Sequence, residues 1–259
     1  MSGHRPRKRF GQHFLTDPHA IMRILDAVNP TAKDHIVEIG PGQGALTDAL
    51  ARHAQTLTLV ELDRDLVKRL QRRYEAHEHV QIVSADALTV DFAALGESLR
   101  IVGNLPYNIS TPLLFHLRAS ARRTVDMHFM LQKEVVDRIA ATPGSKHYGR
   151  LSVMLQCCFD TLSLFDVGPE AFDPPPKVNS SVIRLTPKDA VDPMTQTAAF
   201  ADLVLQAFSQ RRKTIRNSLR QQLSIAQIIA ADVDPGARPE TLSVQDFARL
   251  SACGTADSE

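Results

Sequence analysis

The chain has 259 residues, of which 43% are hydrophobic and 23% charged, a balance typical of a soluble globular protein. No apolar run approaches the roughly 20 residues that a membrane-spanning helix needs. The basic N-terminus is not followed by the apolar segment of a secretory signal. Three cysteines cannot form a disulfide framework, so we expect a cytoplasmic protein.

The formal net charge is only +1, but the basic residues are clustered. One cluster, Arg7, Lys8 and Arg9, lies near the N-terminus. The other lies in a later segment without acidic residues and comprises Arg211, Arg212, Lys213, Arg216 and Arg220. Clustered basic residues are typical of nucleic-acid-binding surfaces, although a solvated arm and a solvated helix face give the same pattern.

In chain order, residues 1–14 are predicted to form a basic arm, and Asp17 is predicted to cap a helix. Strands and helices then alternate. The predicted strands are 35–39, 57–61, 80–84, 100–104 and 124–132, with helices at 45–54 and 63–76 and a third helix that ends at about residue 120. Ser110 or Thr111 is the expected N-cap of the last helix, with Pro112 as its first residue. Because most of these strands are continuous apolar runs, we expect an α/β fold with a mostly parallel central sheet and helices on both faces.

The C-terminal part of the sequence has a different pattern. Residues 161–167 and 181–185 are strand-like and can form a hairpin at one sheet edge. After residue 187 the alternation stops, and the predicted helices are 197–208, 210–222, 225–231 and 243–251. We therefore expect one α/β domain at 1–187 and a small all-helical domain at 188–259.

Two motifs predict a cofactor that contains adenosine. The turn Gly40–Gly44 joins a strand to a helix, where glycines let a ligand approach the backbone near the positive end of the helix. Glu61 ends the next strand, about 20 residues later, where an acid can accept hydrogen bonds from both ribose hydroxyls. These features do not separate NAD from S-adenosylmethionine. A ligand-free turn and an acid that caps a helix are the structural alternatives.

Two further strand ends carry groups suited to ligand binding. Asp86 follows the third strand and can accept a hydrogen bond from an adenine amine, or simply cap a turn. Asn104-Leu105-Pro106-Tyr107 follows the fourth strand. Ligands of open parallel sheets bind outside the carboxyl ends of the strands, so four consecutive strand ends of this kind predict one shared site.

These motifs resemble those of a known enzyme family. Glu38–Gly44 resembles the glycine motif of class I S-adenosylmethionine-dependent methyltransferases. Asn104–Tyr107 resembles the (Asn/Asp)-Pro-Pro-(Tyr/Phe) motif of amino methyltransferases, in the Asn-Leu-Pro-Tyr form of rRNA adenine dimethyltransferases. Further segments that resemble this family are Phe10–Leu15, Met127–Glu134, Tyr148–Ser152 and Phe172–Val178. From about residue 8 to residue 222, the chain is thus similar to the bacterial rRNA adenine N6,N6-dimethyltransferases of the KsgA type.

The resemblance implies a Rossmann-like class I methyltransferase fold with S-adenosyl-L-methionine as the cofactor. The implied reaction is dimethylation of two adjacent adenosines in the 3′-terminal hairpin of 16S rRNA, within an immature small subunit. The implied cofactor-binding residues are His13, Leu15, Gly40, Glu61, Asp86 and Asn104. Position 13 departs from the family pattern, which usually has Asn there. We expect a monomer, no membrane partner and, because the ten histidines lack ligand spacing, no metal.

The four residues Asn104–Tyr107 are the expected catalytic turn. The side-chain oxygen of Asn104 and the carbonyl of Leu105 can each accept one N–H of an adenine amine, which aims the nitrogen lone pair at the methyl donor. Pro106 has a fixed φ and stiffens the turn. Tyr107 can stack on the base, which is worth roughly 1–3 kcal/mol, and the resemblance implies that Phe172 stacks on its other face. Core packing is the alternative for both rings.

Three other functions are compatible with parts of the pattern. An enzyme of the same fold could act on adenines of large-subunit rRNA or of DNA. An RNA-binding assembly factor for the small subunit could share the basic surfaces. An NAD oxidoreductase could share the glycine turn, but that function does not explain the motif Asn104–Tyr107.

Overall fold

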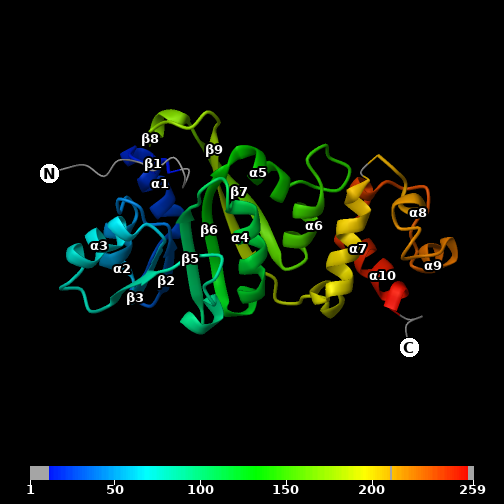
Figure 1. The fold of residues 1–259 in the computed structure, drawn as a ribbon, viewed down its shortest axis with the longest axis horizontal. Coiled ribbons are helices and arrows are strands. Elements are labelled where there is room, and N and C mark those ends of the chain that lie inside the picture. Colours follow the sequence, from blue (N-terminus) through cyan, green and yellow to red (C-terminus); the bar gives the residue numbers. More distant parts are fainter. Residues whose placement is uncertain (1–11, 211, 256–259) are drawn as a thin grey trace. The chain divides into compact units, whose positions relative to one another are not determined.

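The computed structural model describes residues 12–210 and 212–255, which divide into two compact units (Figure 1). The first unit comprises the chain up to Val136 together with Leu162–Pro187. The second comprises Asp137–Thr161 and the residues from Lys188 onward. This division differs from the predicted one in a single segment, because residues 137–161 group with the helical unit rather than with the α/β unit.

A seven-stranded sheet in the order β4-β3-β2-β5-β6-β9-β7 forms the centre of the first unit (Figure 1). Neighbouring strands from β4 to β6 pair in parallel, and β9 pairs antiparallel with β6. The strands are β2 (His35–Ile39), β3 (Thr56–Glu61), β4 (Val80–Ser84), β5 (Leu99–Asn104), β6 (Thr124–Gln132), β7 (Phe159–Val167) and β9 (Ser180–Pro187). The mostly parallel sheet is confirmed, and β7 and β9 lie at one edge as predicted.

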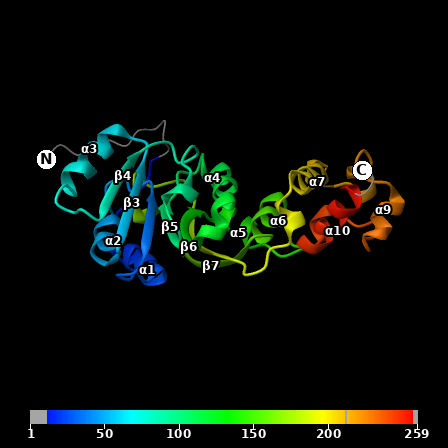
Figure 2. The same ribbon diagram turned by 90° about the horizontal axis from the view of Figure 1, so that it is seen from below.

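Three helices pack against one face of this sheet, because their apolar side chains share a core with alternate residues of the strands. They are α1 (Pro18–Val28), α2 (Thr47–His53) and α3 (Arg64–Arg73). The predicted cap of α1 is confirmed, since the Asp17 carboxylate accepts hydrogen bonds from the backbone N–H groups of His19 and Ala20. Figure 2 shows α4 (Ser110–Leu117) on the side of the sheet away from α1 and α2.

The chain direction across the sheet reverses between β2 and β5. From β2 the order runs through β3 to β4 on one side, and β5 and β6 lie on the other side. At such a switch point the loops after the two central strands diverge, which leaves a crevice at their carboxyl ends. Gly40 follows β2 and Asn104 ends β5, so both predicted motifs lie at this crevice.

The predicted start of α4 is wrong. Its N-cap is Ile109, without a side-chain cap, and the helix begins at Ser110. The Ser110 hydroxyl instead donates a hydrogen bond to the Tyr107 carbonyl at 3.1 Å. The serine therefore stabilises the Asn104–Tyr107 turn rather than the end of the helix.

Helices make up most of the second unit (Figure 2). They are α6 (Arg150–Gln156), α7 (Ala198–Ser209), α8 (Ile215–Ser218), α9 (Ile225–Ala230) and α10 (Val244–Thr255), and α5 (Lys133–Ile139) precedes them. The predicted helix 210–222 is wrong, because only the four residues of α8 are helical. The N–H groups of Ile215 and Arg216 donate to the carbonyls of Ala237 and Pro235, so a neighbouring loop takes the place of a preceding helical turn. No helix in the described ranges has the length and apolar character needed to cross a membrane.

Candidate active site

The glycine turn after β2 passes close beneath the N-terminal segment. Gly40 and Gly42 have φ angles of 67° and 59°, in the left-handed region that favours glycine. A Cβ atom at Gly42 would lie 3.1 Å from the Phe14 ring. Glycine at position 42 therefore allows the turn and the Phe14 side chain to approach each other at the edge of the pocket.

Glu61, at the end of β3, holds the glycine turn in place. Its Oε2 accepts a hydrogen bond from the Gly42 N–H at 3.2 Å, and its Oε1 accepts one from the Asp63 N–H at 2.8 Å. Burial raises the pKa of the Glu61 carboxyl, although these N–H donors lower it in part. Each carboxylate oxygen can accept a further hydrogen bond, so the same side chain can shape the turn and bind hydroxyl groups in the pocket.

We expect Glu61→Ala to weaken S-adenosylmethionine binding by about 10- to 150-fold, the effect of losing a hydrogen bond to a charged group. Isothermal titration calorimetry measures this affinity directly. Glu75→Ala, which removes an exposed carboxylate beyond α3, is the matched control. Unchanged affinity in the Glu61 variant would remove this residue from the cofactor site.

Glu38, within β2, is a site residue that the sequence analysis named only as part of the glycine motif, without a role of its own. It lines the pocket and is only 2% exposed. Within the described part of the chain, its Oε2 has no hydrogen-bond partner. Burial and the negative charges of Glu61 and Asp48 raise the pKa of Glu38 to about 8, against the opposing effect of Thr47. The feature of the sequence that could have identified Glu38 is its position, because it is an acidic residue inside an otherwise apolar strand, two residues before Gly40.

The raised pKa of Glu38 predicts a pH dependence of stability. The folded protein keeps this proton up to about pH 8, whereas the unfolded chain loses it near the ordinary value of 4.5. Between these values the folded state binds more protons, so the free energy of unfolding falls as the pH rises. We expect Glu38→Gln to reduce this decline in urea titrations at several pH values, whereas Glu78→Gln, on an exposed loop, should not. Equal slopes for wild type and the Glu38 variant would contradict the assignment.

Asp86, after β4, lines the same pocket. Its Oδ1 accepts a hydrogen bond from the Leu88 N–H at 2.9 Å, so it caps the turn that follows the strand. The cap and the ligand-binding role are compatible, because the carboxylate retains further acceptor positions.

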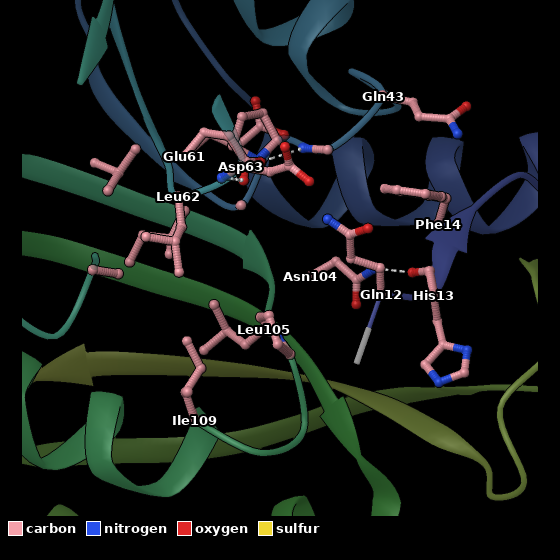
Figure 3. A pocket seen from close by; sticks show the side chains of 18 of the residues that line it. Gln12, His13, Phe14, Gln43, Glu61, Leu62, Asp63, Asn104, Leu105 and Ile109 are labelled. Carbon is pink, nitrogen blue, oxygen red and sulfur yellow. Dashed lines mark hydrogen bonds between the residues drawn. The ribbon is translucent and has the colours of Figure 1, made fainter. Parts of the chain in front are cut away.

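Asn104 is oriented by the main chain of the N-terminal segment. Its Nδ2 donates to the His13 carbonyl at 3.0 Å (Figure 3). Because a carbonyl oxygen only accepts, this contact fixes which end of the amide faces His13 and leaves Oδ1 as the acceptor of the side chain. Leu105 is buried, and its N–H donates to the Met130 carbonyl, which anchors the turn to β6.

The pocket is enclosed from three directions, as Figure 3 shows. Glu61 and Asp63 lie on one side, and Leu105 and Ile109 lie opposite. The segment Gln12–Phe14 borders a third side. The pocket brings together nine residues that the sequence selected, namely His13, Leu15, Gly40, Glu61, Asp86, Asn104, Leu105, Pro106 and Tyr107.

The implied position of Phe172 is not observed. Phe172 belongs to the short strand β8 (Phe172–Asp173), which pairs with β1 (Phe14–Leu15). It is 4% exposed, packs in the hydrophobic core with Leu15, and does not line the pocket. The pairing with β1 buries the ring, so core packing, the structural alternative, is what the structure shows for this residue.

The basic residues of the second unit are exposed where the structure describes them. Arg212, Lys213, Arg216 and Arg220 are all exposed, whereas Ile215 and Leu219 of the same segment are fully buried. The apolar side chains thus hold the segment and leave the cations accessible. Arg7, Lys8, Arg9 and Arg211 lie outside the described residues.

Comparisons with known proteins extend over nearly the whole chain. Residues 3–254 match the family described as ribosomal RNA adenine dimethylase. A Ribosomal RNA small subunit methyltransferase A from Bordetella petrii is 54% identical, over 97% of this chain and 96% of that protein. The protein of the same description from Idiomarina loihiensis is 52% identical, over 96% of this chain and 88% of that protein.

Two solved structures are similar in fold. A dimethyladenosine transferase from Plasmodium falciparum has a TM-score of 0.79 at 24% identity, over 92% of this chain and 96% of that one. The 23S rRNA methyltransferase ErmE has a TM-score of 0.72 at 26% identity, over 93% of this chain and 98% of that one. Both support the Rossmann-like methyltransferase fold, and the match over residues 3–254 confirms the resemblance found in the sequence. The chain belongs to the ribosomal RNA adenine dimethylase family.

Proposed function

We propose that this protein transfers methyl groups from S-adenosylmethionine to the N6 amines of two adjacent adenosines in the 3′-terminal hairpin of 16S rRNA. The observation that supports this most strongly is the Asn104 amide, which lies in the pocket with its oxygen left as an acceptor. We further propose that the substrate is an immature small subunit and that the protein works as a cytoplasmic monomer. Cys157, Cys158 and Cys253, all in the described part of the chain, form no disulfide there, as is usual in a reducing compartment.

The pocket suits a cofactor that combines adenosine with a positive charge. The Glu38 carboxyl, which keeps its proton up to about pH 8, offers a buried oxygen that has no hydrogen-bond partner in the described part of the chain, and Glu61 and Asp63 add carboxylates nearby. Gly40 and Gly42 would admit the ligand to the backbone, Glu61 would bind the ribose, and Asp86 would accept from the adenine amine. When bound, S-adenosylmethionine supplies an electrophilic methyl group on a sulfonium.

The Asn104–Tyr107 turn would present the target amine. The Asn104 oxygen and the Leu105 carbonyl each accept one N–H, which draws the nitrogen toward tetrahedral geometry. The Leu105 N–H bond to Met130 and the Ser110 bond to Tyr107 keep this turn in place. An amine that is already neutral needs no base before attack, so alignment supplies a large share of the rate. The proton leaves after transfer, and water can accept it.

The exposed cations of the second unit would bind phosphates. Such contacts position an RNA without reading its sequence and weaken with added salt. A base paired within a helix cannot reach the Asn104 turn, so the target must be a loop base or a flipped one. A hairpin loop meets this requirement.

The experiment offers labelled S-adenosylmethionine together with unmethylated small subunits, large-subunit rRNA or adenine-containing DNA. We expect label in small subunits, and dimethyladenosine after digestion to nucleosides. Label confined to large-subunit rRNA would favour the alternative of an enzyme of the same fold that methylates adenines of large-subunit rRNA. Dimethyladenosine found only in DNA would reject the proposal. If the protein binds small subunits but methylates none of the three substrates, the result would favour the alternative of an RNA-binding assembly factor.

A further inference from the structure

Helix α3 turns a dense set of positive charges to the solvent. Half of its ten residues are basic, and Asp65 is its only acidic residue. The basic residues are Arg64, Lys68, Arg69, Arg72 and Arg73, and all five are exposed. The buried side of the helix consists of Leu66, Val67 and Leu70. Figure 1 shows α3 on the outside of the first unit, beside α2. The helix therefore forms a basic surface, although the formal net charge of the chain is only +1.

Three of these cations form a row along one side of α3, which we call the α3 stripe. Arg64, Lys68 and Arg72 are spaced four residues apart, so each lies next to the following one on the helix surface. The rise of about 1.5 Å per residue spreads them over about 12 Å of the helix axis. A nucleic-acid strand with one phosphate per about 3.4 Å of its axis presents about four phosphates over this length. The stripe therefore matches the charge and the length of a short stretch of nucleic-acid backbone.

Stability of the helix does not explain the α3 stripe. Like charges four residues apart repel each other and destabilise a helix. Arg64 is the first residue of α3, where a positive charge also opposes the helix dipole. Within residues 12–210 and 212–255, none of the three cations forms an ion pair that would offset this repulsion. A role in binding an anionic partner accounts for the arrangement.

Arg73, which lies away from the stripe, has a structural role instead. Its guanidinium pairs with Asp48 of α2 and donates to the Gln43 carbonyl at 3.3 Å. The Tyr74 hydroxyl donates to the same Asp48 carboxylate at 2.6 Å. These contacts hold the C-terminal end of α3 against α2 and the glycine turn. The stripe is therefore fixed in position relative to the pocket.

The α3 stripe begins at the edge of the pocket. Leu62 and Asp63 line the pocket, and Arg64 is the next residue of the chain. Figure 3 places Asp63 across the pocket from Leu105, so α3 begins on the side of the pocket opposite the catalytic turn. An RNA that reaches both the turn and the stripe must extend well beyond its target base.

We propose that the α3 stripe binds the phosphate backbone of small-subunit rRNA, outside the nucleotides that enter the pocket. This inference rests on the proposed function, because it takes the anionic partner to be the substrate RNA. It adds a basic contact surface on the first unit to the exposed cations of the second unit. Contacts of this kind position an RNA without reading its sequence and weaken with added salt.

The test measures binding of unmethylated small subunits at several salt concentrations by a triple variant with Arg64→Gln, Lys68→Gln and Arg72→Gln. We expect the affinity at about 0.1 M salt to fall by about 10- to 100-fold. The slope of log affinity against log salt concentration should become shallower by about 2–3, the effect of losing three phosphate contacts. The kcat with saturating subunits and the Kd for S-adenosylmethionine should each change less than about twofold, because the three residues are not among those that line the pocket.

Two control variants separate the position of the charges from their number. A triple variant with Lys33→Gln, Arg52→Gln and Arg122→Gln removes the same charge from exposed positions near the amino ends of β2, β3 and β6. It should bind subunits nearly as well as wild type. A double variant with Arg64→Lys and Arg72→Lys keeps the charge of the stripe and should retain most of the affinity, because lysine binds phosphate as a point charge.

Three results would overturn the inference. The first is an unchanged affinity in the stripe variant, or an equal loss in the variant at residues 33, 52 and 122. The second is a loss of affinity with the salt slope of wild type, because the lost contacts would then not be to phosphates. The third is unchanged binding to subunits together with lost binding to phosphatidylglycerol vesicles, which would assign the stripe to a lipid surface. A wild type that methylates no small subunits would reject the proposed function, whereas the binding data would still decide the role of the stripe.

Discussion

Asn104→Ala is expected to lower kcat for methyl transfer by about 100- to 1,000-fold, the loss typical of removing one preorganised hydrogen-bonding group from an active site. The variant loses the oxygen that accepts an N–H of the adenine amine. It also loses the bond from Nδ2 to the His13 carbonyl. Since the glycine turn and Glu61 are unaltered, we expect cofactor affinity to change only a few-fold.

Single-turnover methylation of small subunits, with saturating S-adenosylmethionine, separates this effect from binding. Asn179→Ala is the matched control, because it removes an exposed asparagine side chain just before β9. A near wild-type rate in the Asn104 variant would show that the turn does not hold the amine. A large loss of cofactor affinity would instead place Asn104 mainly in the cofactor site.

Arg100→Met is expected to lower the free energy of unfolding by about 3–5 kcal/mol, the cost of breaking a buried ion pair. The guanidinium donates to both carboxylate oxygens of Asp126 at 2.9 and 2.7 Å, and to Asp34 at 2.8 Å. It also donates to the carbonyls of Val28 and Asn29, at the end of α1. The Arg100 side chain is 12% exposed, so its loss leaves two carboxylates without their shared partner in a poorly solvated place.

Urea denaturation measures this change, and Arg123→Met is the control. Arg123 pairs with Glu97 at an exposed position, where an ion pair contributes about 0–1 kcal/mol. Equal losses in the two variants would contradict a special role for the Arg100 network.

The same network predicts how stability responds to acid. Burial tends to raise the pKa of Asp34, but hydrogen bonds from Thr31 and Arg100 hold it below the ordinary value of 3.8. A carboxylate with a lowered folded-state pKa stabilises the protein above its unfolded pKa and loses that contribution as the pH falls through the folded value. The difference between wild type and Arg100→Met should therefore shrink below about pH 4.

Local sequence predicted the sheet and much of the pocket because both depend on short-range patterns. The apolar run His35–Ile39 forms a strand with the predicted bounds, since it is buried among parallel neighbours. Glu61, Asp86 and Asn104 line one pocket because parallel strands bring their carboxyl ends to the same edge.

Long-range contacts account for the wrong predictions. The burial of Phe172 depends on the pairing of β1 with β8, between segments more than 150 residues apart in the chain. The predicted helix 210–222 is interrupted because Ile215 and Arg216 bond to the loop at residues 235–237. Neither contact leaves a periodic pattern in the sequence. Their physical cause is pairing with a distant segment rather than local propensity.

The central claim is that the Asn104 turn presents adenosine amines of small-subunit rRNA to the methyl donor. Mass spectrometry of the 3′-terminal hairpin, recovered from small subunits after reaction with the protein and S-adenosylmethionine, tests it most directly. We predict two methyl groups on each of two adjacent adenosines with wild type, and an unmodified hairpin with Asn104→Ala. An unmodified hairpin with wild type, or methyl groups elsewhere in the subunit, would contradict the account.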